Sequence, residues 1–544
     1  NGFSLGAPNY GGTNDNGSEY IAWTFRKQAK FCDIVSYTGN NGTQTINHNL
    51  GVTPGMIMVK RLDSAGNWAI YHRSLGATKY VNLNQNFQAY TNSSYWNDTA
   101  PTSTQFSVGL TSSVDSAPYI AYLFAHHNSD GEFGPNSDQD VIKCGSFSTD
   151  SSGNATVNLG FEPQWLMVKA TNQNYNWEIY DQIRGFGVTG HNILIPNSSN
   201  AESSNTTAGN TQPTSTGFSI GGGYWGNNVD LIYMAIRRGP LAEPTSSSDV
   251  FAISTNGQAG DSKAPAYRST FPVDMYFEKS TGSSAWYISS RLTGSKYMST
   301  NATSAEATDS NLKYDFMNGV YNSTGSNSAY YGWMWRRAPS YFDVVCYTGN
   351  YTDGRTVTHN LGVAPEMIWV KLRDTYSAEW MVFHKDLTTN HNLQLDSDVA
   401  SADYSGRVRS PTATTFTVGN DTSVNRQSPL QYIAYLFATV AGVSKVGSYT
   451  GSGASQTIDC GFSNGAKFVL IKCTSQNSTP WLLFDSVRGL TTNVDPHLRL
   501  DSTDAEASQA ANDIEPHNSG FIVNSVNNTN NGNGESYIFY AIAI

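Results

Sequence analysis

The amino-acid sequence repeats itself, and this self-similarity constrains the fold more than any other feature. The stretch YIAWTFRKQAKFCDIVSYTGN from Tyr20 matches YYGWMWRRAPSYFDVVCYTGN from Tyr330. A second stretch, TINHNLGVTPGMIMVK from Thr45, matches TVTHNLGVAPEMIWVK from Thr356. Two long stretches with almost the same offset predict that one structural block occurs twice along the chain.

A shorter repeat lies within the longer one. A tryptophan opens an apolar segment five times, and each segment is preceded by a lysine that closes another apolar run. These markers are Trp68, Trp177, Trp286, Trp380 and Trp481, with Lys60, Lys169, Lys279, Lys371 and Lys472. Their spacing predicts five units of about a hundred residues, an ordinary domain size. We place them at 31–138 (unit 1), 139–248 (unit 2), 249–339 (unit 3), 340–442 (unit 4) and 443–544 (unit 5).

The units are of three kinds. Units 1 and 4 share HNLG and YIAYLFA, whereas units 2 and 5 share an Asp-x-x-Arg-Gly turn. Unit 3, which diverges most, resembles the segment 1–30, because Trp23 corresponds to Trp333. The order therefore indicates two copies of a three-unit block, the first of them incomplete. We interpret residues 1–27 as the last two strands of a unit, and expect polypeptide upstream of residue 1, or another chain, to supply the missing strands.

Each unit has the pattern of a β-sandwich. In unit 1, DIVSYTG and TQTINHNL alternate apolar and polar residues, as half-buried strands do. MIMVKRL is more continuously apolar and indicates a central strand, and turn residues recur every 8 to 12 positions. We predict an all-β protein, a tandem array of antiparallel, jelly-roll-like sandwiches of about seven to eight strands each. A barrel is the lesser alternative, and helix should be scarce.

The connections between units are short, as in FRKQAK and RRAPS, which predicts a semi-rigid array. Trp23, Trp333 and Trp335 lie near these joints. They could pack between neighbouring units, but we expect them inside their own sandwiches.

Composition limits the partners. Only 14% of the residues are charged and the formal net charge is −11, so a basic footprint for nucleic acid is not expected. No apolar run approaches the roughly 18 residues that span a bilayer, so we expect no membrane insertion. A surface of short neutral polar groups suits an extracellular or virion location. The odd count of five cysteines is not a disulfide framework, and only Cys460 and Cys473 could meet across adjacent strands.

Motifs of catalysis and metal binding have simpler explanations. The GxSxG pattern occurs around Ser4 and Ser219, but repeat-equivalent positions read QFSVG and TFTVG, which predicts strands whose Phe106, Phe218 and Phe416 point inward. His48 and His359 are equivalent to each other and have no zinc-ligand spacing. The carboxylates near 126–140 lack an EF-hand pattern, and we interpret this segment as an acidic linker. We therefore expect no catalytic residue, metal or cofactor.

Aromatic side chains in polar loops are the remaining candidates for binding. Tyr95, Trp96, Tyr224 and Trp225 lie in SSYWNDT and GGGYWGNN. Aromatic faces in such loops can stack on sugar rings, while nearby amides bind hydroxyl groups. The alternative is that they cover one end of a sandwich or form a subunit contact. We name these four residues as candidate glycan contacts.

The phrases HNLGVTPGMIMVK, NWAIYH and YIAYLFA resemble a repeated module of large virion proteins in marine phages, particularly those of cyanobacteria. The resemblance implies a tail fibre or other structural appendage, located at the virion surface. It carries no catalytic motif and no established functional residue.

We therefore expect a non-enzymatic, oligomeric virion appendage that contacts other copies of itself or other virion proteins. Host surface polysaccharide is a further expected partner. A bacterial cell-surface adhesin or extracellular filament protein is the first alternative, and a polysaccharide-degrading tailspike is the second.

Overall fold

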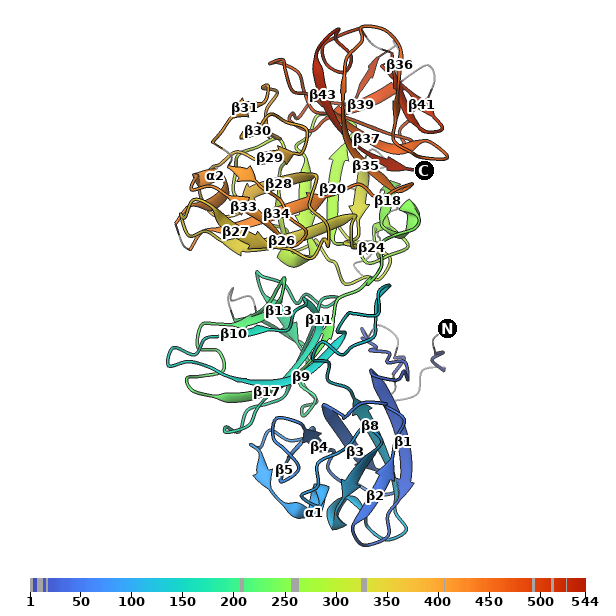
Figure 1. Ribbon diagram of the computed structural model, residues 1–544, viewed down its shortest axis with the longest axis vertical. Coiled ribbons are helices and arrows are strands. Elements are labelled where there is room, and N and C mark those ends of the chain that lie inside the picture. Colours follow the sequence, from blue (N-terminus) through green and yellow to red (C-terminus); the bar gives the residue numbers. More distant parts are fainter. Residues whose placement is uncertain are drawn as a thin grey trace.

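The computed structural model describes residues 3–6, 13–15, 18–205, 210–255, 264–323, 330–405, 407–427, 429–491, 495–509, 513–524 and 526–544. Antiparallel strands dominate these residues (Figure 1). The helices within these ranges are single turns: α1 (Ser93–Trp96), α2 (Thr422–Asn425), η1 (Leu110–Ser112), η2 (Ser247–Asp249) and η3 (Arg291–Thr293). No described helix has the length and apolar character required to cross a membrane. The predicted all-β class is confirmed.

In every unit a larger sheet faces a smaller one. The larger sheet has the same strand order throughout, because the last strand of the unit lies between the first and the third. In unit 1 this order is β1-β8-β3-β4-β5-β6, and the small sheet is β2-β7. The unit 1 strands are β1 (Cys32–Thr38), β2 (Gln44–Asn47), β3 (Met56–Arg61), β4 (Ala69–His72), β5 (Lys79–Asn82), β6 (Tyr90–Thr91), β7 (Gln105–Val108) and β8 (Pro118–Phe124).

Unit 2 has the large sheet β12-β11-β17-β9, the small sheet β10-β16-β15 and a separate pair β13-β14. Its strands are β9 (Ile142–Ser148), β10 (Ala155–Asn158), β11 (Pro163–Ala170), β12 (Glu178–Asp181), β13 (His191–Ile193), β14 (Ser203–Asn205), β15 (Thr211–Thr214), β16 (Gly217–Ile220) and β17 (Asp230–Arg237).

Unit 3 has the large sheet β18-β25-β20-β21-β22-β23 and the small sheet β19-β24. Its strands are β18 (Phe251–Thr255), β19 (Tyr267–Arg268), β20 (Met275–Ser280), β21 (Tyr287–Ser290), β22 (Lys296–Met298), β23 (Ala307–Thr308), β24 (Gly319–Val320) and β25 (Tyr330–Trp335).

Units 4 and 5 have the large sheets β26-β34-β28-β29-β30-β31 and β35-β43-β37-β38-β39-β40, over β27-β33-β32 and β36-β42-β41. The unit 4 strands are β26 (Phe342–Thr348), β27 (Arg355–Thr358), β28 (Met367–Leu372), β29 (Met381–His384), β30 (His391–Gln394), β31 (Ala402–Asp403), β32 (Val408–Arg409), β33 (Thr415–Val418) and β34 (Gln431–Phe437). The unit 5 strands are β35 (Ser444–Thr450), β36 (Gln456–Asp459), β37 (Ala466–Cys473), β38 (Leu482–Asp485), β39 (Asp495–Arg499), β40 (Ala507–Gln509), β41 (Ile514–His517), β42 (Gly520–Val523) and β43 (Ser536–Ala543).

The large sheets of units 3, 4 and 5 are buried on both faces, which explains their continuously apolar strands. Along β28, Ile368 and Val370 point into the sandwich of unit 4. Met367 and Trp369 point the other way, into a second core. Successive side chains on a strand point to opposite faces, so one apolar strand contributes to both cores.

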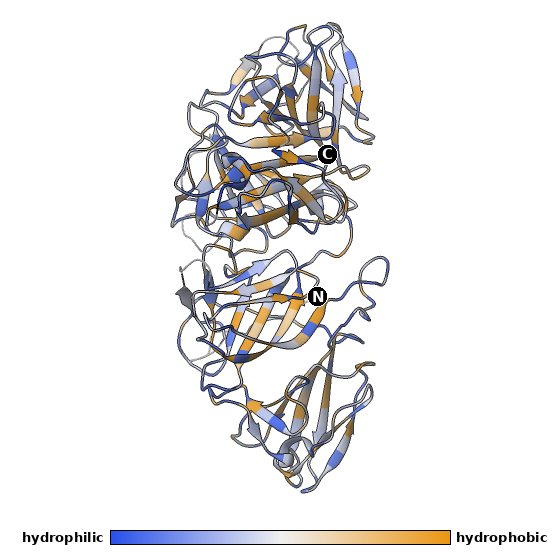
Figure 2. Ribbon diagram, turned by 60° about the vertical axis from the view of Figure 1, so that its left-hand side comes forward, coloured by the Kyte–Doolittle hydropathy of each residue, from blue (hydrophilic) through white to orange (hydrophobic). Residues whose placement is uncertain are grey.

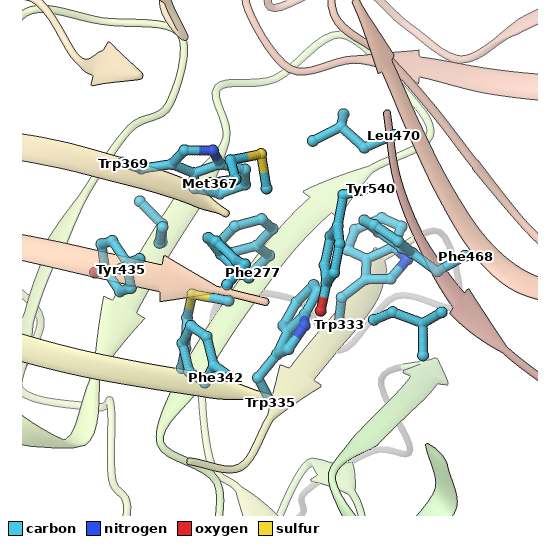
Figure 3. Close-up of a cluster of buried hydrophobic side chains, with 14 of the residues drawn as sticks. Phe277, Trp333, Trp335, Phe342, Met367, Trp369, Tyr435, Phe468, Leu470 and Tyr540 are labelled. Atoms are coloured by element: carbon cyan, nitrogen blue, oxygen red, sulfur yellow. The ribbon is translucent and has the colours of Figure 1, made fainter. Parts of the chain in front are cut away.

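This second core is shared by three units. Phe277, Trp333 and Trp335 of unit 3 meet the inward faces of units 4 and 5 in one buried cluster. Figure 3 shows these rings beside Phe342, Met367, Trp369, Tyr435, Phe468, Leu470 and Tyr540. Trp335 lies 5.5 Å from Phe468 and Phe277 lies 5.8 Å from Trp369, measured between ring centroids. The expectation that Trp333 and Trp335 lie inside their own sandwich is therefore wrong, because they fill the space between sheets.

Units 1 and 2 also share a core, in which Trp165, Met167 and Trp177 of unit 2 pack with residues of unit 1. The segment before unit 1 lies outside the sheets of the structure. Its described residues, 3–6, 13–15 and 18–27, form no strand. In unit 3 the corresponding strand β25 pairs with β18 and β20, and these described residues contain no counterpart of either strand.

Candidate functional site

The interfaces between units are built from the repeated tryptophan and lysine. Trp380 Nε1 of unit 4 donates to the carbonyl oxygen of Ser299 in unit 3 at 2.9 Å. Trp286 of unit 3 donates to Arg499 of unit 5 at 2.7 Å, and Trp481 of unit 5 donates to Gln394 of unit 4 at 2.9 Å. The three donations run from unit 4 to 3, from 3 to 5 and from 5 to 4. Units 3, 4 and 5 therefore form a closed ring.

The lysine of each unit follows the same path. Lys371 Nζ donates to Thr303 of unit 3, Lys279 to Thr503 of unit 5, and Lys472 to Asp398 of unit 4. These ammonium groups are buried, and burial lowers the pKa of each lysine to about 8. Each also donates to a carbonyl oxygen in its own unit, so every buried ammonium group has acceptors on both sides of the interface.

The first block contains one interface of the same type. Trp177 Nε1 of unit 2 donates to Asn82 of unit 1 at 2.8 Å, and Lys169 Nζ donates to Asn86 at 3.2 Å. This is the counterpart of the contact from unit 5 to unit 4. Burial also lowers the pKa of Lys169 to about 8.

A second contact occurs in both blocks. Trp333 of unit 3 donates to Asp485 of unit 5 at 3.2 Å, and Arg488 pairs with the same carboxylate at 2.6 Å while lying over the tryptophan ring. In the first block, Trp23 donates to Asp181 at 3.1 Å and Arg184 lies over its ring. The Asp-x-x-Arg-Gly turn shared by units 2 and 5 is therefore a receptor for a tryptophan of the third kind of unit.

A buried ion-pair network joins the two blocks. Arg337, at the end of unit 3, is 1% exposed and forms two hydrogen bonds of 2.8 Å with the carboxylate of Glu162 in unit 2. Asp274 and Asp343 also lie within 4 Å of its guanidinium. These carboxylates raise the pKa of Arg337 against the effect of burial. Such a bidentate contact fixes both distance and orientation between the blocks.

The four candidate glycan contacts lie against protein. Trp96 and Trp225 are 1% and 2% exposed, and Tyr95 stacks on Tyr80 with 3.7 Å between ring centroids. The hydroxyl of Tyr224 donates to Glu178 at 2.8 Å. The ring faces of the two tryptophans are covered by the core, so a sugar could stack on them only after local opening. Glycan contact through these residues stays a prediction.

The residues that the sequence explained as structural have structural contacts. Phe106, Phe218 and Phe416 are buried, as predicted, on β7, β16 and β33. His48 and His359 bind backbone groups of their own units. All five cysteines, Cys460 and Cys473 among them, are free. In the part of the chain that the structure describes, no three His, Cys, Asp or Glu side chains are grouped as metal ligands.

Sequence reasoning found the tryptophan and lysine markers but not their role. Their spacing placed them at equivalent positions of each unit. The folding of each separate sandwich is enough to explain such a repeated position, so no interface had to be assumed. The signal that could have revealed an interface is a lysine in an otherwise continuously apolar strand, since a buried ammonium group needs acceptors from elsewhere.

A comparison with protein families agrees with the division into blocks. One family model, described as a domain of unknown function (DUF7483), matches residues 1–240 and again residues 247–544. The second match covers the closed ring of units 3, 4 and 5. A search of curated proteins found no match. Because the two matches together cover almost the whole chain, the protein belongs to the DUF7483 family, with two copies of the domain in tandem.

Proposed function

We propose that this chain is a structural subunit of a virion appendage, such as a tail fibre of a marine phage. The observation that carries the proposal is the closed ring, in which the tryptophan and lysine of each unit donate hydrogen bonds to a neighbouring unit. These hydrogen bonds fix the positions of the units relative to one another. A rigid spacer in a virion appendage requires this property. The resemblance of the repeated phrases to phage virion modules supports the same function.

The junction between blocks supports a stiff spacer. Buried contacts between Glu162 and Arg337 are reinforced by hydrogen bonds from Asn360 to Ser215 at 2.7 Å and from Val188 to Leu292 at 2.8 Å. A flexible linker would leave the two blocks free to rotate. In Figure 1 the blocks lie one above the other along the longest axis, so further copies of the block would extend the particle in one dimension.

The proposal is tested on purified virions of a phage that encodes the chain. Antibodies raised against the protein should label an appendage in negatively stained particles, and the chain should appear in mass spectra of the virions. Labelling of uninfected bacterial cells instead would identify a cellular adhesin or filament and would refute the proposal.

Contact with host glycans is a separate part of this proposal. Binding of the folded protein to host envelope polysaccharide, without release of oligosaccharides, would support an adhesive appendage. Release of oligosaccharides would identify a polysaccharide-degrading tailspike and contradict a purely structural role.

A further inference from the structure

The closed ring shows what units 1 and 2 lack. Trp68 of unit 1 is the counterpart of Trp380, whose Nε1 donates to unit 3. Trp68 keeps the stacking on a tyrosine of its own unit, Tyr122, with 6.1 Å between ring centroids. Its Nε1 has no acceptor among the residues that the structure describes. Trp380 is fully buried, whereas Trp68 is partly exposed.

Two further residues on the inward face of unit 1 show the same difference. Ile34 is 37% exposed, but its counterpart Val344 is 0% exposed in the second block. Met58 is half-buried, whereas its counterpart Trp369 is 1% exposed and contacts Phe277 of unit 3. Removal of apolar surface from water is favourable, so a partner that covers these exposed apolar side chains would gain binding free energy.

Side chains of units 1 and 2 line an apolar hollow of about 280 Å³. We call it the open face; it is lined by Phe25, Met58, Trp68, Leu83, Tyr122, Phe124, Trp165, Met167, Ile179, Pro196 and Met234. Figure 2 shows that strands of unit 2, in the middle of the molecule, carry many apolar residues. In the second block, Phe277 and Trp286 of unit 3 occupy the corresponding space between units 4 and 5.

The segment 20–25, which corresponds to β25 in sequence, makes the contacts that β25 makes in the second block. Trp23 donates to Asp181 as Trp333 donates to Asp485. Phe25 meets the ring of Trp165 edge to face at 6.1 Å between centroids, as Trp335 meets Phe468 at 5.5 Å. The segment 20–25 thus occupies the position of β25 relative to units 1 and 2, without the sheet to which β25 belongs.

We propose that the open face binds a complete β-sandwich unit of the third kind, which takes Tyr20–Phe25 as its last strand. This unit supplies the counterparts of β18 and β20, the two strands with which β25 pairs in unit 3. Its carbonyl group at the position of Ser299 accepts a hydrogen bond from Trp68 Nε1. Its carbonyl group at the position of Thr303 accepts one from Lys60 Nζ. Lys60 now donates to Gly66 of its own unit at 2.6 Å and has donors to spare.

Unit 3 of a second copy does not fit this role. Its inward face is enclosed by units 4 and 5, through Trp286 bound to Arg499 and Ser299 bound by Trp380. It could reach the open face only by leaving a closed ring. The first block, once completed, has the same closed cycle of three donations as the second.

The test rebuilds the missing unit from the protein's own sequence. Residues 247–329 are fused directly before Tyr20, in place of residues 1–19, so that Tyr20–Phe25 can follow as β25 follows in unit 3. We expect hydrogen exchange over β3 and β4 to slow at least tenfold relative to the unaltered chain. Trp68→Ala in the fused chain should then accelerate this exchange as strongly as Trp380→Ala does over β28. If the grafted unit is folded, as shown by slow hydrogen exchange of its own strands, but β3 exchanges as fast as in the unaltered chain, the proposal is overturned.

A second measurement uses the unaltered chain and does not depend on the graft. The apolar dye 1-anilinonaphthalene-8-sulfonate should bind the open face, and Met58→Glu should reduce its fluorescence at least fivefold. Leu110→Glu, a matched change at an exposed site outside the open face, should leave dye binding unchanged. Equal dye binding by the Met58→Glu variant would refute the open face. A dimer in sedimentation that Met58→Glu dissociates would overturn the occupant, because a second copy would then cover it.

Discussion

Replacement of Trp380 by alanine tests whether the ring interface stabilises the protein. Trp380 is fully buried, and its Nε1 satisfies the carbonyl group of Ser299. Truncating a buried tryptophan costs about 3–5 kcal/mol through lost burial and the cavity that remains. The orphaned Ser299 carbonyl adds about 1 kcal/mol unless water reaches it. We expect a total loss of about 4–6 kcal/mol in the stability of the second block.

The matched control is Trp68→Ala, at the same repeat position in unit 1. Trp68 is partly exposed and has no acceptor for Nε1 among the described residues, so its truncation should cost about 2 kcal/mol, roughly half as much. The difference of at least about 2 kcal/mol corresponds to a factor of at least about thirty in an opening equilibrium. This comparison holds the local sandwich constant and changes only the neighbouring unit.

Native-state hydrogen exchange measures both losses, because an array of several units does not unfold in a single two-state step. Peptides that cover β28 and β22 report on the first variant, and peptides that cover β3 report on the second. Trp380→Ala should also reduce protection in β22 of unit 3, across the interface. Equal losses for the two variants, or a loss confined to unit 4, would refute the assignment of Trp380 to the ring interface.

Three further predictions follow from the buried charges and rings. Burial lowers the pKa of Lys371 to about 8, below its value of about 10.5 in the unfolded chain, so the unfolded chain binds more protons. The free energy of unfolding should therefore rise by about 1 kcal/mol per buried lysine from pH 7 to 9. In denaturant titrations Lys371→Met should show a smaller rise than the wild type, and an identical rise would contradict this. Glu162→Gln should cost about 1.5–3 kcal/mol by removing the bidentate acceptor of Arg337, while Asp274 and Asp343 stay within 4 Å of the guanidinium. It should also broaden the distance distribution in small-angle scattering, and an unchanged distribution would contradict a junction held by this pair. Trp225→Ala should cost about 3–5 kcal/mol in thermal unfolding because Trp225 is 2% exposed, and an unchanged melting temperature would show that it does not support the core of unit 2.

The fold class could be predicted because every unit carries the same local signals. Alternation in DIVSYTG, turn residues at regular spacing and the repeated Trp and Lys markers all agree on short antiparallel strands. The inward direction of Phe106, Phe218 and Phe416 could be predicted by comparing units, and the same comparison removed a catalytic interpretation of the GxSxG pattern. Agreement between units supplied information that one unit alone would lack.

The packing between units could not be predicted from these signals. A continuously apolar run such as MIWVKL indicates a strand that is buried on both faces, but it does not say which unit covers the second face. The burial of the indole rings in the loops with Tyr95–Trp96 and Tyr224–Trp225 could not be predicted either. Their neighbours are polar, yet α1 and the turn before β17 direct the indole rings inward.

The cycle formed by units 3, 4 and 5 has a consequence for assembly. Three separate copies of one sandwich would meet through the same head-to-tail contact and would dissociate on dilution, as any homotrimer does. Joining the three in a single chain makes each contact intramolecular, so rotational pseudo-symmetry is retained at any concentration. The individual units are then free to diverge, provided that the three donors and three acceptors of the cycle are kept.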